Sequence, residues 1–367
     1  MNILITGSEG FIAKNLKIRL LEKHHSVLEF KKGMKFNDFV PNLHSIDLVF
    51  HLAGENRPED INDFKKNNED LTNDLANLLQ NSKKNIPVFF SSSTQVSEQN
   101  PYSNSKKNAE IILKKLYEKN GNLINIYRLP NIFGKWSKPN YNSAVATFCY
   151  NISRKLEIDV HDPNKPLSLL YIDDLIDIFE NDLEDLNSGF NVKETKKYFK
   201  TTVGKVADLI SSFETYESVE PISEVGEGLE RALYSTYLSF LPKDKVSFKL
   251  TVNEDQRGKF VEVLKTKKSG QFSFLTAHPG QVRGQHYHHS KNEKFLVLSG
   301  NAEFNFKNLI SNETFKIKTS ERDPMIVRTI PGWIHNIKNI GKKELIVMLW
   351  ANELFDPENP DTIAADI

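Results

Sequence analysis

Tyr102 and Lys106 stand four residues apart in the segment YSNSK, so a phenol and an ammonium group share one face if this segment is helical. A nearby ammonium lowers the pKa of a phenol, and such a phenol can pass its proton to a forming alkoxide. Ser93, at the end of an apolar run that begins at Val88, can donate a hydrogen bond to the same oxygen. These three residues predict a catalytic triad for reduction of a carbonyl group.

A second group of chemically active residues lies near the other end of the chain. Alternation places His286 and His288 on one face of a strand, and Glu293 and His335 can converge on them from neighbouring strands. Three imidazoles and one carboxylate suit zinc or another divalent transition metal, so we expect a metal site. The alternative is a cavity that these side chains line without holding a metal.

The segment from Gly7 to Ala13, GSEGFIA, follows the first apolar run and opens an amphipathic helix. Such a turn presents bare backbone N–H groups and a helix N-terminus to a pyrophosphate, which predicts dinucleotide binding by Gly7, Gly10, Phe11 and Ile12. An NAD site usually has an acid about 20 residues later, but this sequence has Lys31 followed by Lys32. Both can neutralise a 2′-phosphate, so we expect NADPH; Glu29 is the acid that could favour NADH.

Short apolar runs alternate with helical stretches as far as about Asp182, which predicts a Rossmann-like, doubly wound parallel sheet. After about Lys243 the sequence changes to short β-rich runs between Gly, Pro and Asn turns, which predicts an all-β barrel. We therefore expect an α/β domain over residues 1–243 and an all-β domain over 244–367, with a helical, polar substrate-side segment at 187–245. The expected strands are 3–6, 27–30, 48–52, 88–91 and 124–129, then 272–276, 295–298 and 345–350.

Composition narrows the classes of partner. The 48 Lys and Arg residues balance 48 Asp and Glu residues, which argues against a nucleic-acid or anionic-membrane partner and favours small molecules. No apolar run reaches transmembrane length, and Met1 to Thr6 resembles a buried strand rather than a signal sequence, so we expect a cytoplasmic enzyme without membrane insertion. The single cysteine, Cys149, excludes an internal disulfide.

Five motifs make the chain similar to the extended short-chain dehydrogenase/reductase family over about residues 1–240. They are TGSEGFIA at 6–13, HLAG at 51–54, the FSSS strand that ends at Ser93, YSNSK at 102–106 and RLPNIFG at 128–134. The resemblance implies the triad Ser93, Tyr102 and Lys106, with Asn131 beside the substrate and cofactor. We also assign Leu52, Ala53 and Gly54 to the cofactor site. Arg128, which opens the last of these motifs, can equally well be a structural ion-pair partner as a residue of the active site.

Many members of that family act on nucleoside-diphosphate sugars. Asn142, before Ser143 and an apolar helix, is a candidate seat for the substrate pyrophosphate. Sugar 4,6-dehydratases of the family carry an acidic pair after the triad hydroxyl residue, whereas Ser93 is followed by Thr94 and Gln95. This difference favours simple carbonyl reduction over dehydration.

The histidine motifs, with Gly280, Gly300 and Pro331 around them, resemble the two motifs of cupins over about residues 246–367. The segments DQRGKFVE at 255–262 and RGQHY at 283–287 are also similar to deoxysugar 3,5-epimerases of the cupin type. In those enzymes the histidine after Arg-Gly is a general base, so His286 has two possible roles, ligand or base. We assign Arg257, Glu262 and Arg283 to substrate binding.

An extended short-chain reductase followed by a cupin resembles the bifunctional capsular-polysaccharide enzymes that help to make UDP-N-acetyl-L-fucosamine. The resemblance implies C3 epimerisation of a UDP-linked 4-keto-deoxysugar, UDP-2-acetamido-2,6-dideoxy-4-hexulose, then reduction at C4 by NADPH toward the L-talo sugar. It also implies zinc in the cupin and a homodimer. Two alternatives remain open: a reductase whose cupin only binds sugar or joins subunits, and an NADP-sensing regulator.

Overall fold

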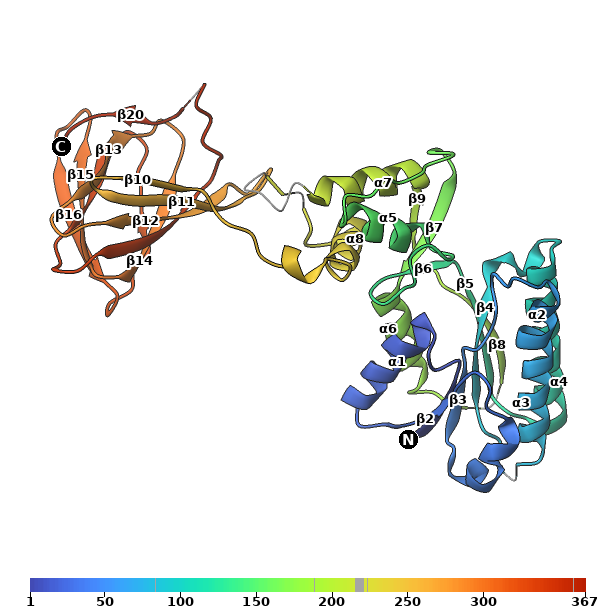
Figure 1. Cartoon of the computed structure of the whole chain (residues 1–367). Coiled ribbons are helices and arrows are strands. Elements are labelled where there is room, and N and C mark those ends of the chain that lie inside the picture. The colour runs from blue at the N-terminus through green and yellow to red at the C-terminus, as the bar shows by residue number, and fades with distance from the viewer. Residues whose placement is uncertain (83, 188, 215–220, 223, 359) are drawn as a thin grey trace. The chain divides into compact units, whose positions relative to one another are not determined.

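The computed structural model describes residues 1–82, 84–187, 189–214, 221–222, 224–358 and 360–367. The chain divides into two compact units (Figure 1). Met1–Ser211 and Ala232–Leu241 form the first unit, while Ser212–Arg231 and Pro242–Ile367 form the second. None of the helices in the described ranges is both long enough and apolar enough to span a lipid bilayer.

A six-stranded sheet, parallel throughout, forms the centre of the first unit in the order β2-β1-β3-β4-β5-β8. This confirms the predicted Rossmann-like fold. The chain leaves β1 for β2 on one side and reaches β3 on the other, which creates a topological switch point at the carboxyl ends of β1 and β3, where α/β proteins bind ligands. The strands are β1 (Asn2–Thr6), β2 (Ser26–Phe30), β3 (Leu48–His51), β4 (Val88–Ser93), β5 (Ile124–Leu129) and β8 (Phe190–Glu194).

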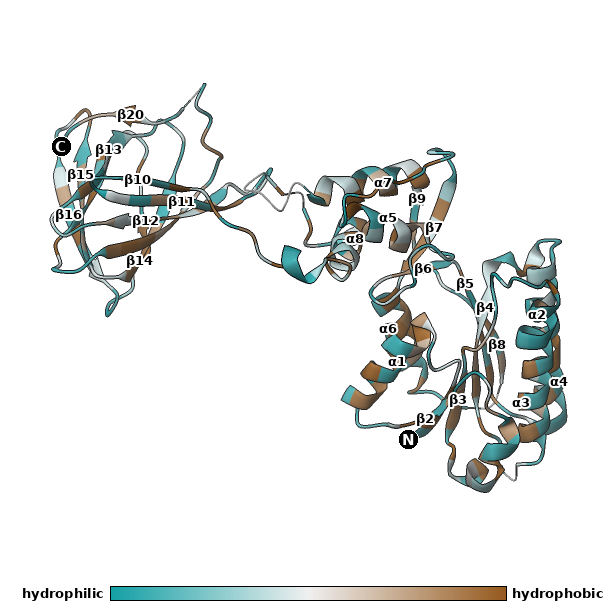
Figure 2. Ribbon diagram, viewed as in Figure 1, coloured by the Kyte–Doolittle hydropathy of each residue, from teal (hydrophilic) through white to brown (hydrophobic). Residues whose placement is uncertain are grey.

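Helices flank this sheet, and their apolar sides supply its cover. Figure 2 shows hydrophobic and hydrophilic bands alternating along these helices, as expected for elements with one buried face. The side chains of β1, β3, β4 and β5 pack against α3 and α4 in one apolar cluster. The α-helices among the described residues, whether or not they flank this sheet, are α1 (Phe11–Glu22), α2 (Asn62–Phe64), α3 (Leu71–Gln80), α4 (Pro101–Asn120), α5 (Ala144–Ile152), α6 (Ile172–Asp182), α7 (Val203–Ser212) and α8 (Gly228–Leu238); the chain also has a 3-10 segment η1 (Phe36–Ser45) and a π-helical segment η2 (Lys65–Asp70).

The expectation of a helical segment over residues 187–245 is wrong for its first part. Strand β8 extends the parallel sheet beside β5, and β9 (Phe199–Thr202) joins β6 (Asn131–Phe133) and β7 (Pro166–Tyr171) in a small mixed sheet. Because β8 is an edge strand with Val192 43% exposed, it lacks the continuous apolar run by which we recognised the central strands. Helices α7 and α8 follow as expected.

Two antiparallel sheets form the second unit and enclose one apolar core, which confirms the predicted all-β barrel. One has the strand order β10-β11-β12-β19-β14-β17, and the other has the order β16-β15-β18-β13-β20. The strands are β10 (Val252–Asp255), β11 (Gly258–Lys265), β12 (Gln271–Ala277), β13 (Val282–Tyr287), β14 (Glu293–Ser299), β15 (Asn301–Asn308), β16 (Thr314–Ser320), β17 (Val327–Arg328), β18 (Trp333–Asn339), β19 (Leu345–Ala351) and β20 (Ile363–Ala364).

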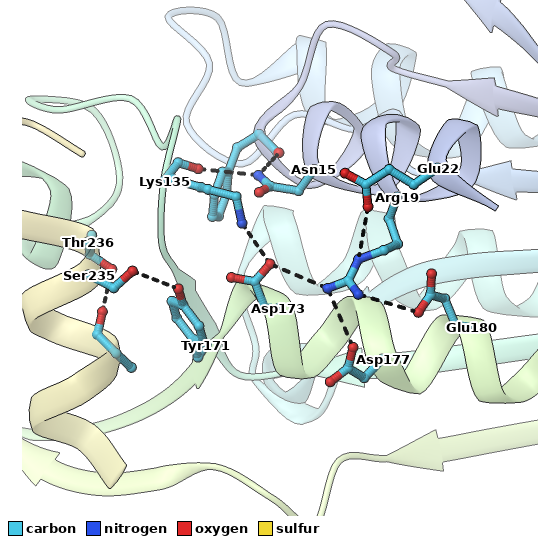
Figure 3. A network of polar contacts seen from close by, with 12 residues as sticks. Asn15, Arg19, Glu22, Lys135, Tyr171, Asp173, Asp177, Glu180, Ser235 and Thr236 are labelled. Atoms are coloured by element: carbon cyan, nitrogen blue, oxygen red, sulfur yellow. Dashed lines mark hydrogen bonds and ion pairs between the residues drawn. The ribbon is translucent and has the colours of Figure 1, made fainter. Parts of the chain in front are cut away.

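A polar network in the first unit joins α1 to α6 (Figure 3). The guanidinium of Arg19 lies 3.7–3.9 Å from carboxylate oxygens of Asp173, Asp177 and Glu180 on α6. Asp173 also accepts a 2.6 Å hydrogen bond from Lys135, which follows β6. The network therefore fixes the helix that begins at the glycine turn against the segment that leads to Asn142.

Candidate active sites of the two units

Helix α4 places the phenol and the ammonium of the predicted triad on one face. The Asn100 side chain caps the helix by accepting a 2.9 Å hydrogen bond from the Ser103 N–H. Tyr102 therefore lies in the first turn, and Lys106 follows one turn later.

Ser93 ends β4 and forms a hydrogen bond with the Tyr102 phenol. Its oxygen also accepts a 3.1 Å hydrogen bond from the Gln95 N–H. Burial raises the pKa of Tyr102, and the hydrogen bond with Ser93 opposes this shift only in part. The net change is upward, opposite to the lowering that we expected from Lys106, and it keeps the phenol protonated at neutral pH, as a proton donor must be.

The side chain of Lys106, the third residue of the predicted triad, is buried. Its Nζ donates a 3.0 Å hydrogen bond to the Ser91 carbonyl and lies 5.0 Å from the centre of the Phe90 ring. Burial lowers the pKa of Lys106 to about 8, and the negative charge of Glu110 opposes that shift. A lysine so placed keeps its charge at neutral pH and loses it in mildly alkaline solution.

Glu110, one turn after Lys106, is a residue that the sequence analysis missed. Its carboxylate accepts hydrogen bonds from the Ser92 hydroxyl at 2.6 Å and from Arg128 at 2.8 and 3.2 Å. Arg128 therefore forms a structural ion pair, which was one of the two roles left open by the sequence. Glu110 ties the catalytic helix to β4 beside Ser93 and to β5. An acidic residue on the buried face of a helix was the signal that could have revealed it.

The glycine turn adopts a conformation that only glycine tolerates easily. Gly7 has a φ of +66°, and a Cβ there would lie 2.7 Å from the Ala53 Cα. Gly10 is the N-cap of α1, and no side chain among the described residues caps it. The first N–H groups of the helix, at Phe11 and Ile12, are therefore available to an anion.

The turn after β3 joins the glycine turn to helix α4. The Ala53 N–H donates a 3.1 Å hydrogen bond to the Thr6 hydroxyl, while Leu52 and Ala53 lie beside the glycine turn. A Cβ on Gly54 would approach Lys106 Nζ to 2.9 Å and Asn68 Oδ1 to 2.8 Å. Gly54 thus leaves the space that the buried lysine needs, and Asn68, which we had not predicted, holds the turn through the N–H and carbonyl of Glu55.

The second strand ends in two exposed lysines, Lys31 and Lys32. Glu29 forms an ion pair with Lys17 of α1, and this hydrogen bond is the main cause of its lowered pKa. Glu29 is therefore engaged by the helix rather than free to meet a ribose hydroxyl.

The two residues of this unit that we expect to contact the substrate, Asn131 and Asn142, are both exposed. Asn131 is the exposed first residue of β6, and Asn142 lies exposed before α5, which Ser143 caps through the Ala146 N–H at 3.2 Å. Next to Asn142, the Tyr141 hydroxyl donates a 2.6 Å hydrogen bond to Glu55, in the loop that follows Gly54. This contact brings the loop of Asn142 to the cofactor side of the unit.

In the second unit, four predicted metal ligands lie together inside the barrel. One donor atom each from His286, His288, Glu293 and His335 lies within 4.8 Å of the others. His286 is directly opposite His335 on paired strands, and a Glu293 oxygen lies 3.3 Å from His288 Nε2 and 3.4 Å from His335 Nε2.

The electrostatics of this cluster fit a divalent metal. The Nε2 atoms of His286 and His335 are buried and have no hydrogen-bond partner among the described residues. Burial, followed by the neighbouring His335, lowers the pKa of His286 to about 4, which leaves a neutral imidazole at pH 7. Burial alone would raise the pKa of Glu293, but its contacts with His288 and His335 hold that pKa well below the ordinary value. A neutral imidazole and an ionised carboxylate are the forms that bind metal.

Two of the three predicted sugar contacts of this unit converge. Arg257 and the buried Arg283 both contact Asp255, at 2.5 Å and 3.4 Å respectively. Glu262 lies instead on β11 opposite Ser273 and forms a 3.0 Å ion pair with Lys265. Asp255 begins the motif that contains Arg257, but the motif alone gave no sign that this carboxylate holds both arginines.

Comparison with known proteins agrees with both halves of this description. Residues 3–192 match the NAD dependent epimerase/dehydratase family, and residues 253–363 match the polysaccharide biosynthesis C-terminal domain. A UDP-2-acetamido-2,6-beta-L-arabino-hexul-4-ose reductase from Pseudomonas aeruginosa is 44% identical over 100% of this chain and 99% of that protein.

Solved structures give the same result. The capsular polysaccharide assembling protein CapF from Staphylococcus aureus is 39% identical and superposes over 100% of both chains with a TM-score of 0.93. A UDP-glucuronic acid 4-epimerase from Bacillus cereus, 17% identical, covers 65% of this chain and 98% of its own with a TM-score of 0.57, which shows a shared fold. The chain therefore belongs to the NAD dependent epimerase/dehydratase family and carries a polysaccharide biosynthesis C-terminal domain behind that part.

Proposed function

We propose that this protein is an NADPH-dependent reductase of a UDP-linked 4-ketosugar, UDP-2-acetamido-2,6-dideoxy-4-hexulose, and that its cupin unit first epimerises that sugar at C3. The observation that carries the proposal is the cluster of Ser93, Tyr102 and Lys106 beside the glycine turn. The alignment of the whole chain with a UDP-hexulose reductase supports this substrate class. Production of a capsule or O-antigen sugar in the cytoplasm is the biological role that we infer.

In the reductase unit, each residue of the triad has a distinct task. NADPH, when bound, supplies the hydride for C4. Tyr102 donates its proton to the alkoxide that forms there, and the raised phenol pKa keeps this proton in place until then. Ser93 orients the carbonyl oxygen by a hydrogen bond, while the Lys106 ammonium favours the phenolate that remains.

The cofactor preference follows from charge at the end of β2. Lys31 and Lys32 are exposed cations where a 2′-phosphate would lie, and the Glu29 carboxylate is already paired with Lys17. This distribution supports NADPH over NADH. Gly7, Gly10, Phe11 and Ile12 would bind the pyrophosphate, and Leu52, Ala53 and Gly54 would complete the cofactor site.

In the cupin unit, a base must remove and return the hydrogen at C3, which the ketone at C4 makes acidic. We propose that His286, His288, Glu293 and His335 hold zinc or another divalent metal, whose chemistry when bound is to stabilise negative charge on oxygen. His286 also occupies the position of the general base in cupin-type deoxysugar 3,5-epimerases, so its role is either that of a ligand or that of the base. Arg257, Arg283 and Glu262 are the residues that we assign to the sugar nucleotide, as are Asn131 and Asn142 in the reductase.

Chemistry fixes the order of the two reactions. Hydride transfer to C4 removes the carbonyl that makes the C3 hydrogen acidic, so epimerisation must come before reduction. A chain that contains both activities converts one intermediate in two consecutive steps.

We further propose that the protein is a homodimer joined through the outer face of its cupin sheet. Three adjacent strands carry apolar side chains there, since Phe272 lies opposite Trp350, and Met348 lies between Phe274 and Leu296. The side chains of Phe272 and Met348 are 40% and 37% exposed. Contiguous apolar side chains that are exposed in this way typically mark a surface that contacts another protein. A Met348→Lys substitution should therefore shift the mass of the protein in solution from dimer to monomer.

The proposed function is tested by incubating the 4-ketosugar with enzyme and NADPH and determining the product configuration at C3 and C4 by NMR. We expect a single product in which C3 is inverted relative to the substrate and the new C4 hydroxyl has one configuration, whereas a borohydride-reduced control should keep the C3 configuration of the substrate. Reduction at C4 with C3 unchanged would instead support the second candidate, a reductase whose cupin only binds sugar or joins subunits.

A further inference from the structure

The last residues of the chain contact the proposed metal centre from outside. We propose that residues 361–366, here called the C-terminal strap, are a positioning element that orients His288 and fixes the loop between two metal ligands. This inference rests on the metal centre proposed above and concerns residues that are not themselves ligands.

The strap covers the open edge of the strand that carries the first ligand. Strand β20 pairs with β13, with Ala364 opposite His286 and Ile363 opposite Tyr287. The pairing continues to the Ala365 N–H, which donates a 3.0 Å hydrogen bond to the Gln285 carbonyl. Because β20 is the outermost strand of its sheet, these contacts hold the edge of β13 on that side.

A hydrogen bond from the strap orients the second ligand. The Asp361 carbonyl oxygen lies 2.5 Å from Nδ1 of His288, a side chain that is only 1% exposed. A carbonyl can only accept, so Nδ1 carries the proton, and a neutral ring with that proton presents its lone pair at Nε2. Nε2 faces the cluster, 3.3 Å from the Glu293 carboxylate. The strap thereby selects the tautomer of His288 that can bind a metal.

The side chain of Asp361 fixes the loop that follows. Its carboxylate accepts hydrogen bonds from three consecutive backbone N–H groups, at His289, Ser290 and Lys291, each at 2.7 Å. The Ser290 hydroxyl adds a fourth at 3.0 Å. Burial opposes the charge on this carboxylate, but the three N–H groups outweigh burial and hold the pKa of Asp361 well below its usual value.

These contacts give Asp361 two separate connections to the site. Its carbonyl fixes the ring of His288, and its carboxylate fixes the loop that connects His288 to Glu293. Groups that orient metal ligands typically change metal affinity by about 10- to 100-fold when they are removed. We therefore expect the strap to contribute to affinity at that level while the barrel folds without it, since its residues lie outside the apolar core.

The experiment measures zinc affinity of the full-length protein by competition with a chromophoric chelator. Asp361→Ala should weaken zinc binding about tenfold, Asp361→Asn less, and a chain that ends at Pro360 about 100-fold. Asp356→Asn is the matched control, because that carboxylate lies in the same tail and accepts a hydrogen bond from the Glu358 N–H. Thermal unfolding of the metal-free proteins verifies that each variant retains its fold.

A spectroscopic readout separates positioning of a ligand from general loosening of the tail. With Co²⁺ in place of zinc, the d–d absorption bands should shift most in the truncated chain, which loses the Asp361 carbonyl that contacts His288. They should shift less in Asp361→Ala, which keeps that carbonyl and loses only the carboxylate, and not in Asp356→Asn. Zinc affinities within twofold of wild type, together with unshifted bands, would overturn the role of the strap. Failure of the wild-type protein itself to bind zinc would overturn the metal centre and this inference with it.

Discussion

The two candidate sites are built in opposite ways. In the reductase unit, Tyr102 and Lys106 belong to one helix, and glycines in two neighbouring turns make room for them and for an anion. In the cupin unit, the four donors come from three strands and a loop, so no element supplies the site by itself. The reductase site depends on local backbone conformation, whereas the cupin site depends on the register of paired strands.

This difference determines what supports each site. In the reductase unit, the charge of the buried Glu110 carboxylate favours the Lys106 ammonium, and its hydrogen bonds with Ser92 and Arg128 hold helix α4 against the sheet. The cupin cluster is backed by the end of the chain, through Asp361. We therefore expect the reductase to be sensitive to changes in charge and the cupin to be sensitive to changes in strand pairing.

The largest effect should come from Tyr102→Phe, which removes the proton donor. We expect NADPH oxidation with the 4-ketosugar to fall about 10²- to 10⁴-fold, since that is the usual value of a positioned acid. Hydrogen exchange at C3 should continue, because it requires only the cupin. The control is Tyr117→Phe on the same helix, whose ring packs against Phe190. Loss of both activities in a folded Tyr102→Phe protein would mean that the two sites are not independent.

His335→Ala should have the next largest effect, on metal content. Because it removes a direct ligand, zinc affinity should fall by more than the factor of about 100 that supporting residues contribute. C3 exchange should fall with it, while NADPH binding measured by fluorescence stays unchanged. His278→Ala, in the same barrel beside Glu344, serves as the control. Equal zinc content in His335→Ala and wild type would remove this histidine from the ligand set.

Glu110→Gln should change the pH dependence of reduction. Lys106 acts as an ammonium, which predominates below its pKa of about 8, so kcat should decline as the pH rises above that value. The Glu110 charge favours the ammonium, so its removal should move this decline by up to about one pH unit toward lower pH. Glu118→Gln, which pairs with Lys114 on the exposed side of the same helix, should leave the profile unchanged. An identical profile for Glu110→Gln would limit that residue to a structural role.

Lys31→Glu should give the smallest effect, a change in cofactor preference. Loss of one charge-assisted contact to the 2′-phosphate should raise the KM for NADPH about tenfold, equivalent to about 1.4 kcal/mol. The KM for NADH should change little. Lys23→Glu, at the far end of α1, is the control. If the wild-type protein prefers NADH, the assignment from Lys31 and Lys32 is wrong.

The sequence predicted those features that short-range patterns specify. Central strands are apolar runs, and the i to i+4 spacing put Tyr102 and Lys106 on one face. Alternation predicted that His286 and His288 lie together, but it was wrong to place both on the strand, because β13 ends at Tyr287 and His288 lies in the loop that follows. The roles of Glu110 and Asp361 could not be predicted, because their hydrogen-bond partners lie 18 or more residues away and only tertiary contacts bring them together. Strand β8 could not be predicted either, because an edge strand is partly exposed and does not need a continuous apolar run. The direction of the Tyr102 pKa shift depended on burial, which spacing does not reveal.

The most direct test of the account measures proton–deuterium exchange at C3 of UDP-2-acetamido-2,6-dideoxy-4-hexulose in heavy water, with purified enzyme and no NADPH. We predict exchange in wild type and in Tyr102→Phe, and its loss in His335→Ala, as expected if the cupin alone performs the first reaction. Absence of exchange in a wild-type enzyme that still reduces this sugar with NADPH would contradict a two-reaction enzyme and leave a reductase with a binding module.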